Sequence, residues 1–163
     1  MAGEVDILDA IAAAFIGVTG LNDEAIYSAG GGNVDGVKPL PDEIGDALPA
    51  LLVLQGDDER FGGSGMERQT WGTQALVWAE YKPRGERYRG LLALKEGLAE
   101  RAAQFSKANL AAHADSALQS FLLTGFGAIE GRQWQRGDSA PWYLVLPITF
   151  EVKVNRPRTY GAQ

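Results

Sequence analysis

The feature that most constrains the fold is the alternation of apolar and polar side chains over residues 142–154. The polar residues Thr149, Glu151 and Lys153 alternate with apolar ones in its second half. The apolar residues of the segment are Trp142, Leu144, Leu146, Ile148, Phe150, Val152 and Val154. A period of two predicts a β-strand with one buried face. At ~3.3 Å per residue the segment would span roughly 43 Å, about twice an ordinary strand. Pro147 lies in its middle, where a proline removes one hydrogen bond of a sheet ladder.

Two interpretations of this long strand follow. In the first, the stretch after Pro147 leaves the subunit's own sheet and pairs with, or packs against, an adjoining subunit. The candidate interface residues are then Ile148, Phe150, Glu151, Val152 and Lys153. In the second, the segment is an ordinary edge strand bent by a bulge, and helices cover its apolar face.

Patterns elsewhere predict a mixture of helices and strands. Helical spacing of apolar residues is expected over 4–18, 86–107 and 115–123, and strands are expected over 25–28, 49–55, 70–82 and 126–136. This order predicts an α+β fold, with a mainly antiparallel sheet of about four to five strands and helices packed on one face.

The length of 163 residues predicts a single domain spanning 1–163. Two glycine-rich segments, near 29–38 and 57–69, are expected to be mobile loops. Glycine loses more backbone freedom on folding than other residues do, so such segments hold regular structure at a cost.

The sequence predicts no enzyme, and no catalytic, cofactor-binding or metal site. It has no cysteine and one histidine, His113, which nearly excludes a zinc site. The glycines of 30–36 match neither a dinucleotide fingerprint nor a phosphate-binding loop, and Met66 replaces the last glycine of a nucleophile elbow. The acidic run 57–59 lacks the alternating ligand spacing of a calcium loop and is interpreted as a solvated charge run.

Charge is distributed unevenly along the chain. Residues 1–60 hold twelve Asp/Glu and two Lys/Arg, a net of −10, whereas residues 61–163 hold nine and thirteen, a net of +4. The overall charge of −6 argues against a general nucleic-acid binder. Either folding mixes the two halves, or the protein keeps an acidic and a basic side. No apolar run approaches the ~20 residues that cross a bilayer, and the acidic first residues are unlike a signal peptide.

One basic cluster stands out, in the segment 82–89. Its cationic residues are the candidate interface residues Lys82, Arg84, Arg87 and Arg89. Three interpretations remain open: a solvated turn, a salt-bridging surface for an acidic protein partner, and a contact with nucleic-acid phosphates, which the overall acidity disfavours.

The order of elements resembles that of the tail terminator, or neck and head–tail joining, proteins of tailed bacteriophages. The resemblance rests on five features that together span most of the chain. They are the apolar helix over 7–18, the strand LPALLVLQG at 48–56, the long strand and charged turn over 74–89, the helix pair, and the closing WYLVLPITFEVKV at 142–154.

The resemblance implies a virion structural protein that forms a ring, commonly a hexamer, at the head–tail junction. Its implied partners are further copies of itself, the tail tube and the neck or connector proteins, while DNA passes through the lumen without sequence-specific binding. It implies no cofactor, no membrane and assembly in the host cytoplasm. The alternatives are another phage assembly part, such as a tail- or head-completion protein, and a small enzyme using carboxylates.

Overall fold

The computed structural model describes residues 4–63, 66–81, 84–104, 118–134 and 140–157. Its elements in chain order are α1 (Glu4–Ala14), the short 3₁₀ helix η1 (Asp23–Ala25), β1 (Ile26–Ser28), β2 (Lys38–Pro39), β3 (Ala50–Gly63), β4 (Met66–Glu80), α2 (Arg84–Gln104), β5 (Leu118–Phe126), β6 (Glu130–Gln133) and β7 (Trp142–Pro157).

The seven strands form one mixed sheet in the order β2-β1-β3-β4-β7-β5, with β6 paired to the first residues of β7. β1 runs parallel to both β2 and β3, whereas the remaining pairs are antiparallel. The expectation of a mainly antiparallel sheet of four to five strands was therefore wrong. The strand expected over 25–28 is present as β1, but the two-residue β2 is too short to show a periodic pattern in sequence, and β5 had been predicted as a helix.

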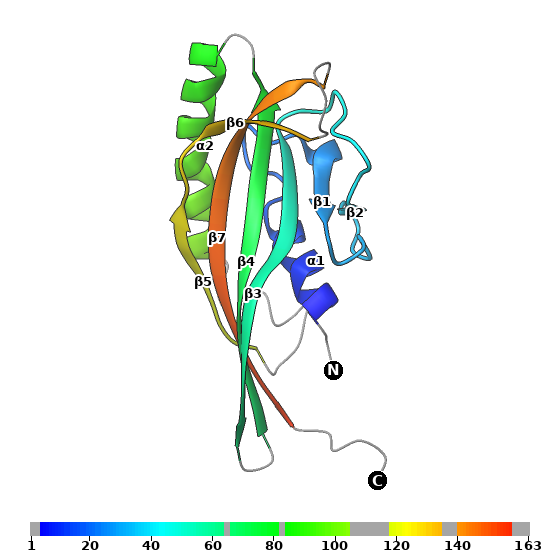
Figure 1. The fold of residues 1–163 in the computed structure, drawn as a ribbon, viewed down its shortest axis with the longest axis vertical. Coiled ribbons are helices and arrows are strands. Elements are labelled where there is room, and N and C mark those ends of the chain that lie inside the picture. Colours follow the sequence, from blue (N-terminus) through cyan, green and yellow to red (C-terminus); the bar gives the residue numbers. More distant parts are fainter. Residues whose placement is uncertain (1–3, 64–65, 82–83, 105–117, 135–139, 158–163) are drawn as a thin grey trace.

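Both described α-helices cover the same face of the sheet (Figure 1). α1 lies against β1 and β3, and α2 lies against β4, β5 and β7. The large core between them contains Phe15 from α1, Trp71 from β4 and Phe150 from β7, each at most 1% exposed. The Phe150 ring stacks on Phe121 at 5.2 Å between ring centroids. Aromatic packing of this kind joins the helices to the middle of the sheet.

A smaller core lies on the opposite face, near the start of β7. Trp78 and Tyr143 are buried there, and the Trp134 ring packs edge-on against Trp78 at 5.4 Å. The segment 42–49 covers this cluster: the Tyr143 hydroxyl donates to the Ile44 carbonyl at 3.2 Å, and the Trp134 indole donates to the Asp42 carbonyl at 2.6 Å. A loop therefore takes the place of a helix on this face.

Pro147 lies in a central strand, because β7 pairs with β4 along one side and with β5 and β6 along the other. The β5 ladder ends at the pair Phe126–Ile148, and the β6 ladder begins at Glu130–Val145. The Pro147 carbonyl accepts from the Gly127 N–H at 2.9 Å, so the missing N–H faces the interruption between β5 and β6. A proline is tolerated there because no strand residue needs that donor. The strand therefore neither departs from the sheet nor lies at its edge, and both of those expectations were wrong, although helices do cover its apolar face as the second interpretation expected.

The glycine-rich segment near 29–38 is held against α1. The buried Asp9 carboxylate accepts from the backbone N–H groups of Gly32 at 3.2 Å and Asn33 at 2.9 Å. A Cβ added at Gly30 would lie 2.6 Å from Asp9 Oδ1, so only glycine fits there. These glycines allow the backbone to approach the helix closely.

The second segment expected to be a loop, near 57–69, forms the far part of the β3–β4 hairpin except for residues 64–65, which lie outside the described residues. The pairing shifts register between Gln55 and Asp58 and then continues to Gly63–Met66. Because this part of β3 is rich in glycine and charged residues, its sequence has no strand pattern, and it is a strand because β4 pairs with it.

The predicted helix over 115–123 was also wrong. Its described part belongs to β5, which pairs with β7 from Leu118 to Phe126. A register shift between Leu118 and Ser120 interrupts this ladder, so Leu118 and Phe121 both reach the core although they are three residues apart. That spacing imitates a helical pattern in the sequence.

Candidate interaction surfaces

Among the described residues, no group of three or more His, Cys, Asp or Glu side chains is placed to hold a metal ion. His113 lies outside the described residues. Nor is any helix in the described ranges long and apolar enough to cross a membrane.

The basic cluster is only partly described. Arg87 pairs with Glu80 across the turn between β4 and α2, with its Nη2 3.1 Å from the carboxylate. Both side chains remain about half exposed, so the pair contributes at most ~1 kcal/mol to stability. Arg89 is exposed on α2, while Lys82 and the side chain of Arg84 lie outside the described residues.

The candidate residues after Pro147 separate into two groups. Ile148, Phe150 and Val152 are at most 1% exposed and belong to the chain's own core. Glu151 and Lys153 lie on the opposite face, where their charged groups are 3.4 Å apart. Residues 148–154 also pair along both edges within the subunit, so this stretch is not a free inter-subunit strand.

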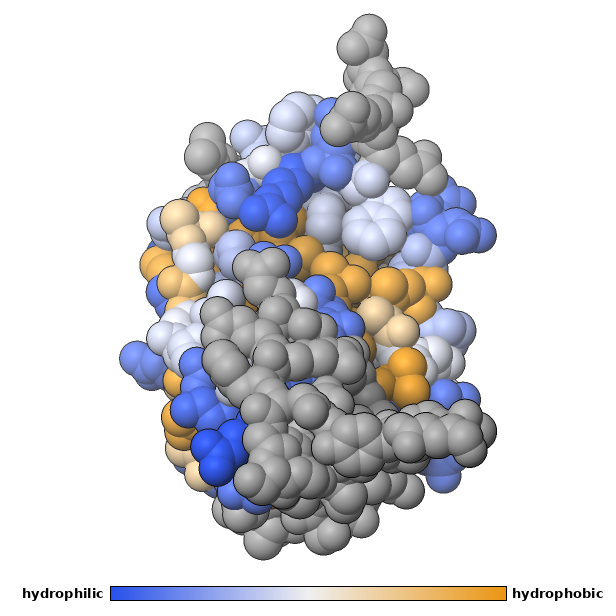
Figure 2. All heavy atoms as spheres, turned by 60° about the horizontal axis from the view of Figure 1, so that its bottom comes forward, coloured by the Kyte–Doolittle hydropathy of each residue, from blue (hydrophilic) through white to orange (hydrophobic). Residues whose placement is uncertain are grey.

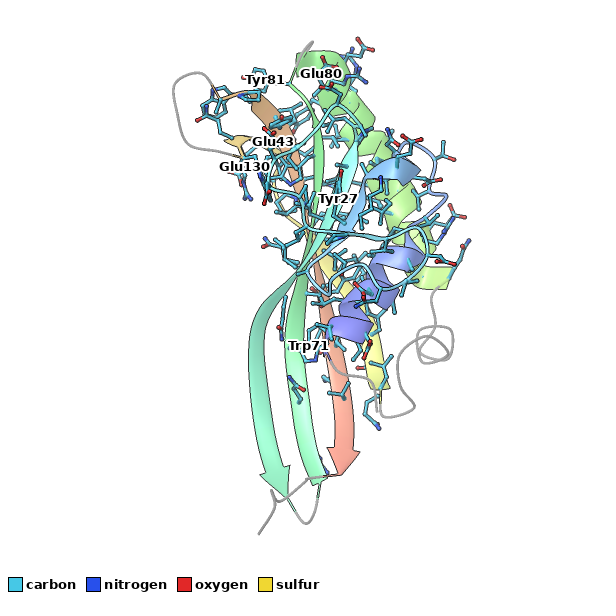
Figure 3. The ribbon with its side chains drawn as sticks, turned by 90° about the vertical axis from the view of Figure 1, so that its right-hand side faces the viewer. Tyr27, Glu43, Trp71, Glu80, Tyr81 and Glu130 are labelled. Carbon is cyan, nitrogen blue, oxygen red and sulfur yellow. The ribbon has the colours of Figure 1, made fainter. Side chains whose placement is uncertain are left out.

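A cleft that the sequence analysis missed opens where β4 ends and β7 begins; we call it the Trp142 cleft. It consists of two adjoining hollows of about 560 and 490 Å³ that share Glu80, Pro141 and Trp142. Tyr81 and Ala140 line the first, and the second also contains Asp46, Leu48, Pro49, Arg87 and Tyr143. Figure 3 shows Glu80, Tyr81 and Glu43 at this end of the molecule.

Trp142 is 54% exposed, although most of β7 is buried. Its ring lies beside Gly131 of β6, where an added Cβ would be 3.5 Å from both Trp142 and Tyr81. Tyr143, the next residue along β7, faces the other side of the sheet and packs edge-on against the buried Trp78 at 5.5 Å. The cleft therefore has one large exposed aromatic side chain, Trp142. Only the run Pro141-Trp142-Tyr143 at a strand start could have indicated it in sequence.

The electrostatic environment of this end is acidic. Burial raises the pKa of Tyr143 above its usual value, and the negative charges of Asp46 and Glu43 raise that pKa further. Glu80 adds another carboxylate, which Arg87 partly neutralises.

Charge also differs between the two edges of the sheet. The segment 21–41, which contains β1 and β2, holds three Asp/Glu and one lysine, whereas Asp42, Glu43 and Asp46 lie at the end of the sheet near Tyr143. α2, beside β5 and β7, holds five Lys/Arg and three glutamates. Because β2 and β5 are the outermost strands of the sheet order, folding keeps the acidic and basic segments at opposite edges (Figure 1).

Apolar side chains also reach the surface elsewhere. The view from the end where the β3–β4 hairpin projects shows them among hydrophilic ones (Figure 2). Exposed apolar residues such as Val5 and Leu122 occur singly on most proteins.

No family model matches the sequence, and a search of curated proteins finds no match.

Proposed function

We propose that the protein is a virion structural protein that assembles into a ring, commonly a hexamer in the proteins it resembles, at the head–tail junction of a tailed bacteriophage. Its partners in this proposal are further copies of itself, the tail tube and the neck proteins, and DNA passes through the lumen. The proposal assigns it no catalytic activity.

The observation that carries the proposal is the separation of charge between opposite edges of one sheet. The segment 21–41, with β1 and β2, holds three Asp/Glu and one lysine, a net charge of −2, and α2 at the other side has a net charge of +2. Contact between the acidic edge of one subunit and the basic edge of the next is heterologous, and heterologous contacts close into rings when the rotation allows it.

The shape of the sheet supports the same proposal. β3, β4 and β7 continue well beyond α1 and α2 and form a projecting arm (Figure 1). Among the described strands, none pairs with the outer edge of β3 beyond Val53. An extended arm with an open edge suits contact with a neighbouring subunit or a tube protein.

Electron microscopy of the purified protein tests this proposal. We expect class averages with cyclic symmetry and an open central hole, in buffer of low ionic strength. A protein that stays monomeric at every concentration, or forms only a closed dimer without a lumen, would contradict the ring. A tail- or head-completion protein would share the ring, and co-sedimentation with isolated tails or with isolated heads separates these two roles.

A further inference from the structure

β5 is the outermost strand on its side of the sheet, and none of the described strands pairs with its outer edge. Its sequence, LQSFLLTGF, contains no charged residue and no proline. Strands at the edge of a sheet usually carry lysine, proline or other charged residues, which block pairing with another chain. An uncharged edge strand on which Leu122 is 56% exposed therefore favours the addition of a further strand.

A second open edge lies on the other side of the same sheet, on β3. The β1 ladder ends at Val53, and beyond it no described strand covers the outer edge of β3. This stretch includes the charged run 57–60, which contains three acidic residues and one arginine, a net charge of −2. β5 and this part of β3 are therefore two open edges of different electrostatic character.

The two open edges lie at the same level of the sheet. Pairing through β4 and β7 places residues of β3 and β5 in common rows, and two such rows are Asp58–Trp71–Val152–Phe121 and Arg60–Gln69–Val154–Leu118. A contact between edges at the same level needs no shift along the strands from one copy to the next. Such a contact closes into a ring, whereas a shift at every step produces a helical filament.

Strand direction fits the same contact. Three antiparallel pairs separate β3 from β5, so the two strands run in opposite directions. Rotation about a ring axis that runs along the strands leaves the direction of each strand unchanged. The β3 strand of one copy therefore lies antiparallel to the β5 strand of the next, as the hydrogen bonds of an antiparallel ladder require.

The charges select β3 of a second copy, rather than a second β5, as the occupant. α2 packs on β5, with Lys95 Nζ 5.3 Å from the centre of the Phe126 ring, and has a net charge of +2. An antiparallel pair of two β5 strands would place two such basic helices next to each other on one face. A neighbouring β3 instead brings the acidic run 57–60 beside α2, so the charges are complementary.

We propose that the outer edge of β5 binds the open part of β3 of a second copy, so that one sheet continues from subunit to subunit. The stretch Ser120–Leu123, which lies between the two register shifts of β5, pairs with residues 57–60 of the neighbouring β3. The contact joins two different surfaces and is heterologous. It rests on the proposed ring and specifies which edges join the subunits.

Disulfide cross-linking tests the contact, because the chain has no cysteine of its own. One protein carries Leu122→Cys, and a second, enlarged by a tag, carries a single cysteine at position 57, 58, 59 or 60. The two are mixed at low salt, oxidised and separated on a non-reducing gel. We expect a mixed dimer for at least one of these positions, since paired strands bring Cα atoms within the ~7 Å that a disulfide spans.

Single proteins and a cysteine away from both edges are the matched controls. Leu122→Cys alone and Asp58→Cys alone should form no disulfide dimer, because a heterologous contact keeps equivalent residues apart. Val5→Cys, at a site that is 50% exposed on α1, should form no mixed dimer with Leu122→Cys. A disulfide dimer of Leu122→Cys alone, formed as readily as the mixed dimer, would show that two β5 strands pair with each other and would overturn the proposal.

A charge on the β5 edge gives a second measurement. Leu122→Glu should weaken self-association roughly tenfold at low salt, because its carboxylate lies opposite the acidic run 57–60. The neutral and similarly shaped Leu122→Gln should weaken it much less, and the difference should shrink towards 1 M salt. Sedimentation velocity measures both variants. Equal weakening by the two would contradict the assignment of the acidic part of β3 as the occupant.

Electron microscopy of the same samples separates this contact from the ring itself. Rings without a mixed dimer at any of the four positions would overturn the contact and leave the ring proposal standing. Mixed dimers without rings would support the contact and contradict the ring. A protein that stays monomeric at every concentration would contradict both.

Discussion

A single arginine closes the end of the first helix. α1 ends at Ala14, and the last carbonyls of a helix have no partners within it. Arg101, from the last turn of α2, donates its Nη1 to the carbonyls of Ala14 at 3.0 Å and Ile16 at 2.7 Å. Its positive charge also suits the negative end of the helix dipole. One side chain therefore holds the two helices together at the face they cover.

Replacing this arginine should cost stability. We expect Arg101→Ala to lower the free energy of unfolding by about 1.5–3 kcal/mol, because partly buried carbonyls lose a charged donor. Arg101→Lys keeps the charge but loses the forked donor group, so its free energy of unfolding should lie between those of the parent protein and of Arg101→Ala. Urea denaturation measures both, with Arg89→Ala on the exposed side of α2 as the control. A loss no larger than that of the control would contradict the capping role.

Tyr143 should make stability sensitive to alkaline pH. Burial and the nearby charges of Asp46 and Glu43 raise its pKa in the folded state. Between the unfolded pKa of ~10 and the higher folded pKa, the unfolded chain has already lost a proton that the folded chain keeps. The free energy of unfolding should therefore fall as the pH rises above ~10.

The variant Tyr143→Phe isolates this contribution. At neutral pH it should cost about 1 kcal/mol, since the hydroxyl donates to the Ile44 carbonyl. Above pH ~10 its stability should fall less steeply than that of the parent protein, as measured by urea denaturation at a series of pH values. Equal slopes in the two proteins would show that Tyr143 does not carry the effect.

At the scale of elements, β7 organises the molecule. It pairs with β4, β5 and β6, and its inward side chains form the floor on which both helices pack. The strand is long because its two halves serve different neighbours. Its first half pairs with β6 and lines the Trp142 cleft, and its second half pairs with β5 and extends into the arm.

Truncating Phe150, at the centre of the buried face of β7, tests whether this residue stabilises the core or forms an interface. We expect Phe150→Ala to lower the free energy of unfolding of the dilute monomer by about 3–5 kcal/mol, because it empties space next to Phe15 and Phe121. The exposed Leu122→Ala should stay within about 0.5 kcal/mol of the parent. A monomer that tolerates Phe150→Ala but no longer self-associates would place Phe150 at an interface after all.

At the scale of the whole molecule, the uneven distribution of charge along the sequence becomes a difference in charge between two sides of the sheet. The segment with β1 and β2, net acidic, forms one edge, and α2, net basic, lies over the opposite side (Figure 1). Exposed charges act over about a Debye length, roughly 8 Å at physiological salt, so they influence association far more than folding.

Reversing part of the basic side should therefore weaken assembly. We expect the double variant Arg84→Glu and Arg87→Glu to self-associate less than the parent at low salt while unfolding at nearly the same urea concentration. The difference should shrink towards 1 M salt, where the Debye length is only ~3 Å. Sedimentation velocity measures it, and Lys153→Glu, on the polar face of the sheet, is the charge-reversal control. Unchanged assembly at low salt would remove the basic cluster from the interface.

Local pattern was sufficient for some elements and insufficient for others. The sequence alone determined α1, α2, β1, the first part of β3, the last part of β4, the hairpin of β6 and β7, and the buried side of β7. It also predicted the uneven charge. It could not predict the Trp142 cleft, since that site joins the ends of β4 and β7 with the segment 45–49.

Tertiary structure alone decided the rest, and the reason is that a strand depends on its neighbours for half of its hydrogen bonds. β2 has only two residues and is a strand because β1 pairs with it, and residues 57–63 are strand only because β4 pairs with them. The apolar residues of Leu118–Leu123 have helical spacing, but the segment is a strand because it pairs with β7. Pro147 indicated an edge, yet it occupies a central strand because β5 ends and β6 begins where its missing donor points.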